Sequence, residues 1–317
     1  MNLPYLIRLV CLSLASFFLV HLALGVIVWA ITPAAIRAAH RARPRWAARF
    51  LLLLRLLPSG AALFVVAGLC VPSYFQLEPD SAERVGVACS VAALLGLGIW
   101  VISIFRGVRA SAHSMRYLRE CRKRISGRRS SLWVIEDTGH VLALAGIVRP
   151  RLVVSRDVLS ALAPRELAAA LRHERAHQSS RDNLKRLILL LAPGLLPFYR
   201  GFETLECGWA KFTEWAADDA AAAGDSRRSL ALAAALVRVA RLGAGSQPSP
   251  LMTSLLVRGQ DLSARVERLL HPALTPERQT PAAVLSVALA LSALMLAILL
   301  RPATFESVHR VLENLIR

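Results

Sequence analysis

The sequence predicts a mainly α-helical membrane protein, with four transmembrane helices and a cytoplasmic α+β domain between the third and the fourth. Three observations lead to this fold class. The 317 residues are 55% hydrophobic and only 6% aromatic, which is too apolar for an ordinary soluble protein of this length. Apolar runs of about 20 residues recur, and each is long enough to cross a bilayer. Basic residues gather in particular connections rather than along the whole chain.

The transmembrane helices are expected at about residues 6–31, 50–71, 85–105 and 281–300. The first three fill the segment 1–106, and the fourth stands alone before a short tail at 301–317. The first run could instead be a secretory signal. However, its apolar stretch is about twice the usual length, and no small-residue cleavage site follows it promptly. We therefore expect a span there.

The distribution of charge sets the expected orientation in the membrane. The first connection, residues 37–49, carries five arginines and no acidic residue, whereas the second, residues 73–83, contains three acidic residues. By the positive-inside rule, the N-terminus lies outside and the block at 107–280 lies in the cytoplasm. The tail at 301–317 then falls outside. We expect a multi-pass protein of the cell (inner) membrane.

The formal net charge of +18 raises nucleic acid as a partner. Most of this charge has a topological explanation, and the arginine-rich segment after the third span sits where anionic lipid headgroups would meet it. We therefore expect membrane lipids as partners and no direct nucleic-acid binding. The five cysteines include no CxxC pair, so neither a disulfide framework nor a cysteine metal site is expected.

The block at 107–280 is expected to begin with strands and continue with helices. The apolar runs "SLWVIED", "HVLALAG" and "RLVVS" are separated by glycine and proline, which favours short strands or a hairpin. A helix of about four turns should begin at Pro164, because Pro164 and Glu166 suit a first turn and apolar residues recur at helical spacing. The next run, "LILLLAPGLLPFY", is too short to span and contains helix breakers, which indicates a broken, interfacial or re-entrant segment.

Two histidines, His173 and His177, are four residues apart on the expected helix. Both imidazoles therefore lie on one face and can bind a single metal ion. Glu174 projects about 100° around the helix from His173, where a carboxylate can deprotonate a water beside the metal without being a ligand. The HExxH spacing is typical of zinc sites but is not decisive alone. A third ligand is required.

The candidates for the third ligand are Glu203, Glu206 and Glu214. Only Glu214 is followed at helical spacing by an aspartate, Asp218, in "TEWAAD". This pair would let Glu214 bind zinc while Asp218 accepts a hydrogen bond from the second nitrogen of a ligand histidine and fixes its tautomer. Glu214 therefore ranks above Glu206.

A simpler interpretation is that residues 173–177 form a solvated polar face of a basic helix. Chance would then have to supply the helix, the HExxH pattern and the ExxxD pattern together. Asp182 either orients a neighbouring side chain or caps the helix end, and the sequence favours neither role. No residue is singled out for stabilising an oxyanion.

These motifs resemble those of the integral-membrane zinc metallopeptidases of the BlaR/MecR type (metallopeptidase family 56), to which the HtpX and CAAX-protease type (family 48) is related. The resemblance covers about residues 130–300. The stretch "GIVRPRLVVSRDVLSALAPRELAAALRHERAHQSSRDNLKRLILLL" is similar to the family's strand, helix and HExxH core. "EWAADDAA" is similar to its third-ligand helix, and "DLSARVERLL" to the basic helix before its last span.

The resemblance implies one Zn²⁺ per chain, bound by His173, His177 and Glu214. Glu174 would act as general base and general acid, and Asp218 would orient a ligand from outside the metal's coordination shell. The domain at 107–280 would then be a gluzincin-like zinc metalloprotease.

The resemblance also implies that the strand around His140, Val141, Leu142 and Ala143 receives an extended substrate by edge pairing. In one respect this sequence differs from the sensor members. Nothing large follows the expected fourth span, where those members carry an extracellular penicillin-binding domain, so we do not expect β-lactam sensing.

The expected function is a metalloendopeptidase that cleaves a cytoplasmic or membrane protein, in regulated proteolysis such as cleavage of a cytosolic transcriptional repressor. One alternative is an HtpX-type protease for membrane-protein quality control. Another is a non-catalytic signalling scaffold, against which the intact HExxH and ExxxD patterns argue. A transporter is disfavoured, because no acidic residue lies near the centre of a span. The polar residues His21 and Arg55 in the spans are expected to pack or to lie at an interface.

Overall fold

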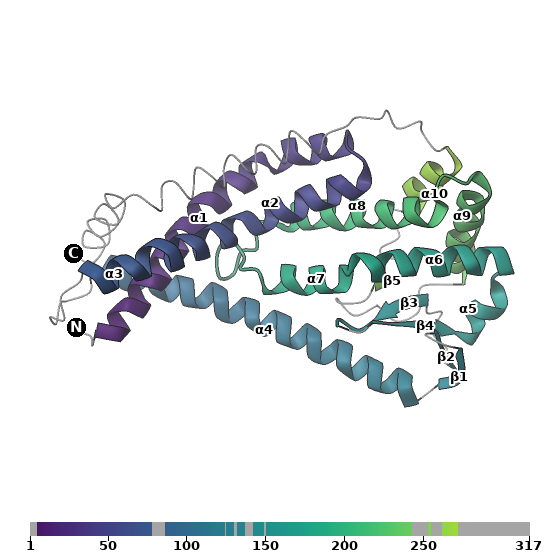
Figure 1. The fold of residues 1–317 in the computed structure, drawn as a ribbon, viewed down its shortest axis with the longest axis horizontal. Coiled ribbons are helices and arrows are strands. Elements are labelled where there is room, and N and C mark those ends of the chain that lie inside the picture. The colour runs from purple at the N-terminus through teal and green to yellow at the C-terminus, as the bar shows by residue number, and fades with distance from the viewer. Residues whose placement is uncertain are drawn as a thin grey trace.

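The structure, a computed structural model, describes residues 5–77, 86–123, 125–129, 132–136, 142–148, 150–242, 253–254 and 262–271. The molecule is elongated (Figure 1): long helices run from the end that carries the N-terminus, and a small sheet with shorter helices occupies the opposite end. This arrangement agrees with the predicted helical chain that carries an α+β domain.

Three helices among the described residues are long and apolar enough to cross a membrane. They comprise Tyr5–His40, Pro44–Gln76 and Val87–Arg122. They correspond to the three predicted N-terminal spans, which supports a membrane protein. The predicted fourth span, residues 281–300, and the tail at 301–317 lie outside the described residues.

The candidate membrane helices are formed by α1 (Tyr5–His40), α2 (Pro44–Val65), the π-helical turn η1 (Val66–Cys70), α3 (Val71–Leu77) and α4 (Val87–Lys123). Helices α1 and α4 continue beyond the predicted span ends at residues 31 and 105. These extensions are rich in alanine and arginine, which are strong helix formers, so the chain stays helical after the apolar stretch has ended. Gly96 permits the close packing of α4 on α1, because a Cβ there would lie 2.5 Å from the Leu14 carbonyl oxygen.

Among the described residues, the sheet has five strands in the order β1-β2-β4-β3-β5. They are β1 (Ile125–Arg129), β2 (Leu132–Ile135), β3 (Leu142–Ala145), β4 (Arg151–Ser155) and β5 (Thr253–Ser254). Strands β2 and β4 are parallel, and the other neighbouring pairs are antiparallel. The three predicted apolar strands are therefore present, with β3 and β4 as an antiparallel pair. The sequence did not indicate β1 or β5, because neither has an apolar alternation.

The remaining helices are α5 (Arg156–Ala161), α6 (Pro164–Ser180), α7 (Asp182–Leu191), α8 (Glu203–Ala222), α9 (Ser226–Arg241) and α10 (Leu262–Leu270). Helix α6 begins as predicted, with Pro164 in its first turn and with Glu166 Oε2 accepting a hydrogen bond from the Ala163 backbone N–H at 2.9 Å. It ends at Ser180, and Arg181, with a φ of 54°, turns the chain into α7. Small side chains at Ala169 and Ala170 are buried in the core that α6 shares with α9.

The segment from residue 192 to 202 joins α7 to α8 without a helix of its own. This is the broken segment that its helix breakers predict. It folds back on itself through a bridge between Leu196 and Tyr199, and Leu195 and Phe202 are buried in a core shared with α1 and α2. The segment therefore connects the membrane helices to the two helices, α7 and α8, that follow the HExxH motif.

Candidate metal centre

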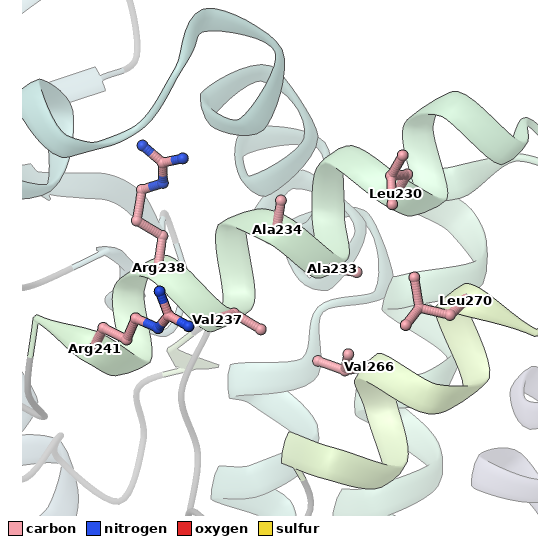
Figure 2. A pocket seen from close by; sticks show the side chains of 8 residues that line it. All are labelled: Leu230, Ala233, Ala234, Val237, Arg238, Arg241, Val266 and Leu270. Carbon is pink, nitrogen blue, oxygen red and sulfur yellow. The ribbon is translucent and has the colours of Figure 1, made fainter.

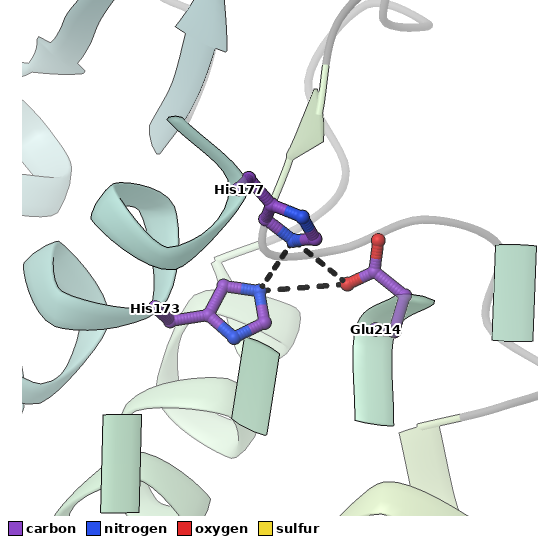
Figure 3. Close-up of side chains that lie close together, drawn as sticks. All are labelled: His173, His177 and Glu214. Atoms are coloured by element: carbon purple, nitrogen blue, oxygen red, sulfur yellow. Dashed lines mark hydrogen bonds and ion pairs between the residues drawn. The ribbon is translucent and has the colours of Figure 1, made fainter. Parts of the chain in front are cut away.

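Helices α6 and α8 bring three potential metal ligands together (Figure 3). His173 and His177 lie one turn apart on α6 and are fully buried, and their Nε2 atoms are 3.2 Å apart. Glu214 of α8 places Oε2 3.5 Å from Nε2 of His173 and 3.6 Å from Nε2 of His177. The structure thus assembles the three residues that the sequence singled out as ligands.

The spacing of these three atoms fits a zinc ion. With zinc–ligand distances of about 2.0–2.1 Å, two ligands of a tetrahedral site lie about 3.3–3.4 Å apart. The three separations of 3.2, 3.5 and 3.6 Å scatter around this value. Two imidazole nitrogens and one carboxylate oxygen are also a donor set that zinc accepts in catalytic sites. The residues present therefore fit the metal that the motif predicts.

A carboxylate lies close to Nδ1 of each histidine, the ring nitrogen that does not face the other two ligand atoms. Asp218 Oδ1 lies 2.9 Å from Nδ1 of His173, and Asp182 Oδ2 lies 2.8 Å from Nδ1 of His177. A proton on each Nδ1 then faces an aspartate. Each Nε2 therefore keeps its lone pair, which is directed at the space between the three ligand atoms. Asp218 thus lies beside His173, and Asp182 lies where it can orient His177, one of the two roles that the sequence left open.

Arg265 of α10 is a residue of the site that the sequence analysis did not single out. Its guanidinium binds Asp218 through two hydrogen bonds, from Nε at 2.8 Å and from Nη2 at 2.7 Å. Its Nη1 also lies 3.3 Å from Glu214 Oε2, and the side chain is 4% exposed. Arg265 therefore links Glu214, the candidate third ligand, to Asp218 beside His173. The only signal in the sequence was the basic helix that ends the family resemblance.

Glu174 lies on α6 beside the ligands and is fully buried. Neither of its carboxyl oxygens has a hydrogen-bond partner among the described residues, so both can take a water or a substrate group. Burial raises the pKa of this carboxyl to about 7. A carboxylate with this pKa can both accept and return a proton near neutral pH, as a general base and acid must.

The electrostatics of the cluster favour a cation between the two histidines. Burial alone would lower the pKa of His177, but the negative charge of Glu214 and the hydrogen bond to Asp182 raise it to about 10. A position that attracts a proton this strongly also attracts a metal ion, which competes with protons for the same nitrogen atoms.

The family model of peptidase family M48 matches residues 116–245. This match indicates a metallopeptidase domain. It spans the end of α4, the sheet from β1 to β4 and helices α5 to α9, and so includes the two histidines, Glu214 and Asp218, but it ends before Arg265. The M48 match supports the family 48 side of the resemblance and not specifically the BlaR/MecR type. No curated protein matches the chain.

The strand that was expected to receive substrate is only partly described. His140 and Val141 lie outside the described residues, whereas Leu142 and Ala143 belong to β3. Strand β3 has β4 on one edge and β5 on the other, where Ala143 faces Ser254. The edge at Ala143 is therefore already paired within the chain, which local sequence patterns could not reveal. An extended substrate would have to displace β5 to pair there.

A groove of about 490 Å³ lies between α9 and α10, outside the metal centre (Figure 2). Its walls are mainly apolar, with two arginines at one end, and its lining residues are Leu230, Ala233, Ala234, Val237, Arg238, Arg241, Val266 and Leu270. None of the ligand residues lines this groove. The groove runs along one face of α10, and another face of the same helix places Arg265 at the candidate metal centre.

Replacing Asp182 by asparagine should weaken zinc binding by about 10- to 100-fold, because the amide no longer holds the Nδ1 proton of His177 with a full negative charge. Asp218→Asn should weaken zinc binding by at least the same factor, since this substitution also breaks the ion pair with Arg265. Competition with a fluorescent chelator measures the dissociation constant. Asp219→Asn is the matched control, because Asp219 is half-exposed and pairs with Arg268 rather than with a histidine. Equal zinc affinity in all three variants would remove the orienting role.

Proposed function

We propose that the protein is a membrane-embedded zinc endopeptidase that cleaves cytoplasmic or membrane proteins. The observation that carries this proposal is the buried group of His173, His177 and Glu214. Beside it lies Glu174, whose carboxyl oxygens have no hydrogen-bond partner within the described part of the chain. The M48 match and the three apolar helices support a membrane-associated metallopeptidase. Cleavage of cytoplasmic or membrane proteins is the part of the proposal that goes beyond these two findings.

Zinc held by His173, His177 and Glu214 would supply a Lewis acid that polarises a peptide carbonyl and acidifies a water. Glu174 takes the proton of the attacking water and later delivers it to the nitrogen of the leaving amine. Its burial removes competing solvent, which strengthens each of these charge interactions. Asp182 and Asp218 keep the two imidazoles in place throughout, because each holds an Nδ1 proton that does not take part in the reaction.

The peptidase domain is proposed to face the cytoplasm of an inner-membrane protein. The support is the concentration of arginine in the connection between α1 and α2 and along the end of α4. The leading biological role is regulated proteolysis, for example of a cytosolic repressor. An HtpX-type role in the quality control of membrane proteins is favoured by the M48 match. Capture of substrates by the inactive Glu174→Gln variant separates them, since a single transcription factor indicates regulation and a broad set indicates quality control.

The zinc content of the detergent-purified chain tests the central claim. We expect about one zinc ion per chain in the wild type, and a large loss in both His173→Ala and Glu214→Ala. His113→Ala is the control, because His113 is exposed on α4, and it should keep its zinc. A well-folded wild-type protein without zinc would overturn the peptidase proposal and favour a non-catalytic scaffold.

A further inference from the structure

A second site lies at the junction between α4 and the 192–202 segment. A cavity of about 220 Å³ opens there, and its lining includes Ile99, Ser103 and Arg106 of α4 together with Phe198 and Arg200 of the segment. It is remote in sequence from the metal ligands, and none of them lines it. We refer to it as the junction cavity.

Two polar atoms of α4 at the junction cavity, Ser103 Oγ and Arg106 Nε, are buried with no hydrogen-bond partner among the described residues. Ser103 is 1% exposed, and its hydroxyl has no hydrogen-bond partner among the described residues, although a helical serine usually donates to the carbonyl four residues earlier. Arg106 donates from Nη2 to the carbonyls of Leu190, at 3.0 Å, and Ala192, at 3.3 Å. Its buried Nε has no partner within the described part of the chain. Buried donors of this kind are costly unless a ligand meets them.

The charges around the cavity do not balance. Two carboxylates lie near the three arginines Arg55, Arg106 and Arg200. Glu206 Oε1 accepts from Arg55 Nε at 2.9 Å and its Oε2 pairs with Arg200, which also lies 3.7 Å from the exposed Glu203. Arg106 is left with backbone carbonyls as its partners among the described residues. The cavity therefore carries an excess of positive charge that an anionic group would neutralise.

The position of the junction cavity matches the membrane surface. Arg106 directly follows the predicted third span, which ends at residue 105. The tip of the segment lies deeper, because a Cβ on Gly98 would be 3.5 Å from the Pro197 side chain. Phe198 is fully exposed and Tyr199 is 52% exposed. Exposed aromatic side chains beside an apolar helix are suited to contact with lipid chains.

We propose that the junction cavity binds the headgroup of an anionic phospholipid. The phosphate accepts hydrogen bonds from Arg106 and Ser103, and the acyl chains lie along Ile99 and Phe198. Charge complementarity favours an anionic over a zwitterionic lipid, and the apolar wall favours a lipid over a free phosphate ion. This inference stands independently of the peptidase activity.

Lipid titration of the detergent-purified full chain, followed by native mass spectrometry, tests the proposal. The probes are phosphatidylglycerol and phosphatidylcholine with identical acyl chains. The wild type should retain phosphatidylglycerol in preference to phosphatidylcholine. Ser103→Leu, which fills the cavity with an apolar side chain, should abolish the preference. Arg106→Gln should weaken phosphatidylglycerol binding by about fivefold, the usual contribution of one arginine near an anionic lipid.

Two further variants keep the test decisive. Arg109→Gln removes an exposed arginine from the same helix and should bind phosphatidylglycerol as the wild type does. Ser103→Ala keeps the packing and loses one donor, so a measurable weakening is expected even if Ser103→Leu does not fold. Equal binding of the two lipids by the wild type, an unchanged preference in both Ser103 variants, or displacement of the lipid by inorganic phosphate would each overturn the proposal.

Discussion

Replacing Glu174 by glutamine is expected to lower the rate of peptide cleavage by about a hundredfold to ten-thousandfold, the usual contribution of general acid–base catalysis. Glutamine keeps the shape of the side chain but cannot take a proton from water. Zinc should stay bound, since Glu174 is not one of the three clustered ligands. Cleavage of labelled, unfolded casein by the detergent-purified protein measures the rate, and metal analysis of the same sample measures the zinc.

The same substitution at Glu267 provides the control, because that glutamate is exposed on α10. Glu267→Gln should retain the wild-type rate. The fold should survive the change at Glu174, whose oxygens have no hydrogen-bond partner among the described residues. Wild-type cleavage by Glu174→Gln would show that another group moves the proton.

Replacing Arg265 by leucine is expected to lower the free energy of unfolding by about 3–5 kcal/mol, because it strands Asp218 as an uncompensated charge in the protein interior. Glu214 loses the same cation, at 3.3 Å. Zinc bound by the three clustered residues would supply positive charge at the same place, so the loss should be larger after the metal has been chelated. Unfolding of the detergent-solubilised protein, with and without zinc, measures both effects.

Arg268→Leu is the matched control for this experiment. Arg268 lies on the same helix and pairs with Asp219, but both side chains are partly exposed, at 24% and 48%. Such a pair contributes at most about 1 kcal/mol. Arg265→Lys should recover only part of the stability, since an ammonium cannot form the two parallel hydrogen bonds to Asp218. Equal losses in Arg265→Leu and Arg268→Leu would rule out a special role for Arg265.

The parts of the fold and site that the sequence could predict are those set by nearby residues. The apolar runs identify the three long helices because the bilayer sets a minimum length. The HExxH and ExxxD spacings identify His173, His177, Glu214 and Asp218 as potential neighbours, because helical geometry places residues four apart on one face. These patterns are local, and the structure adds the packing of α6 on α8 that joins them.

The remaining parts of the site depend on contacts between distant residues. Arg265 is 47 positions from Asp218, and Arg268, also on α10, looks the same in sequence. Asp182 reaches His177 only because Arg181 turns the chain with a positive φ; in a continuous helix a residue five positions on would face away. The pairing of β5 with β3 rests on two residues more than a hundred positions away, for which no periodic pattern exists.

Arg55 and His21 were expected to pack or to lie at an interface, and the structure places both beside the 192–202 segment. Arg55 Nη2 donates to the carbonyls of Ala192 and Pro193. His21 Nε2 donates to the Gly194 carbonyl at 2.9 Å. These side chains satisfy backbone oxygens that the broken segment cannot pair within a helix, which explains how polar residues are tolerated in apolar helices.

The complete burial of His173, Glu174 and His177 limits how often a substrate can reach these side chains. In the proposed peptidase, a substrate would reach these side chains only after the chain around α6 had opened. The frequency of such an opening would then set an upper limit on the rate of hydrolysis, whatever the affinity for the substrate. In a crowded membrane, such a limit would protect the neighbouring proteins from indiscriminate cleavage.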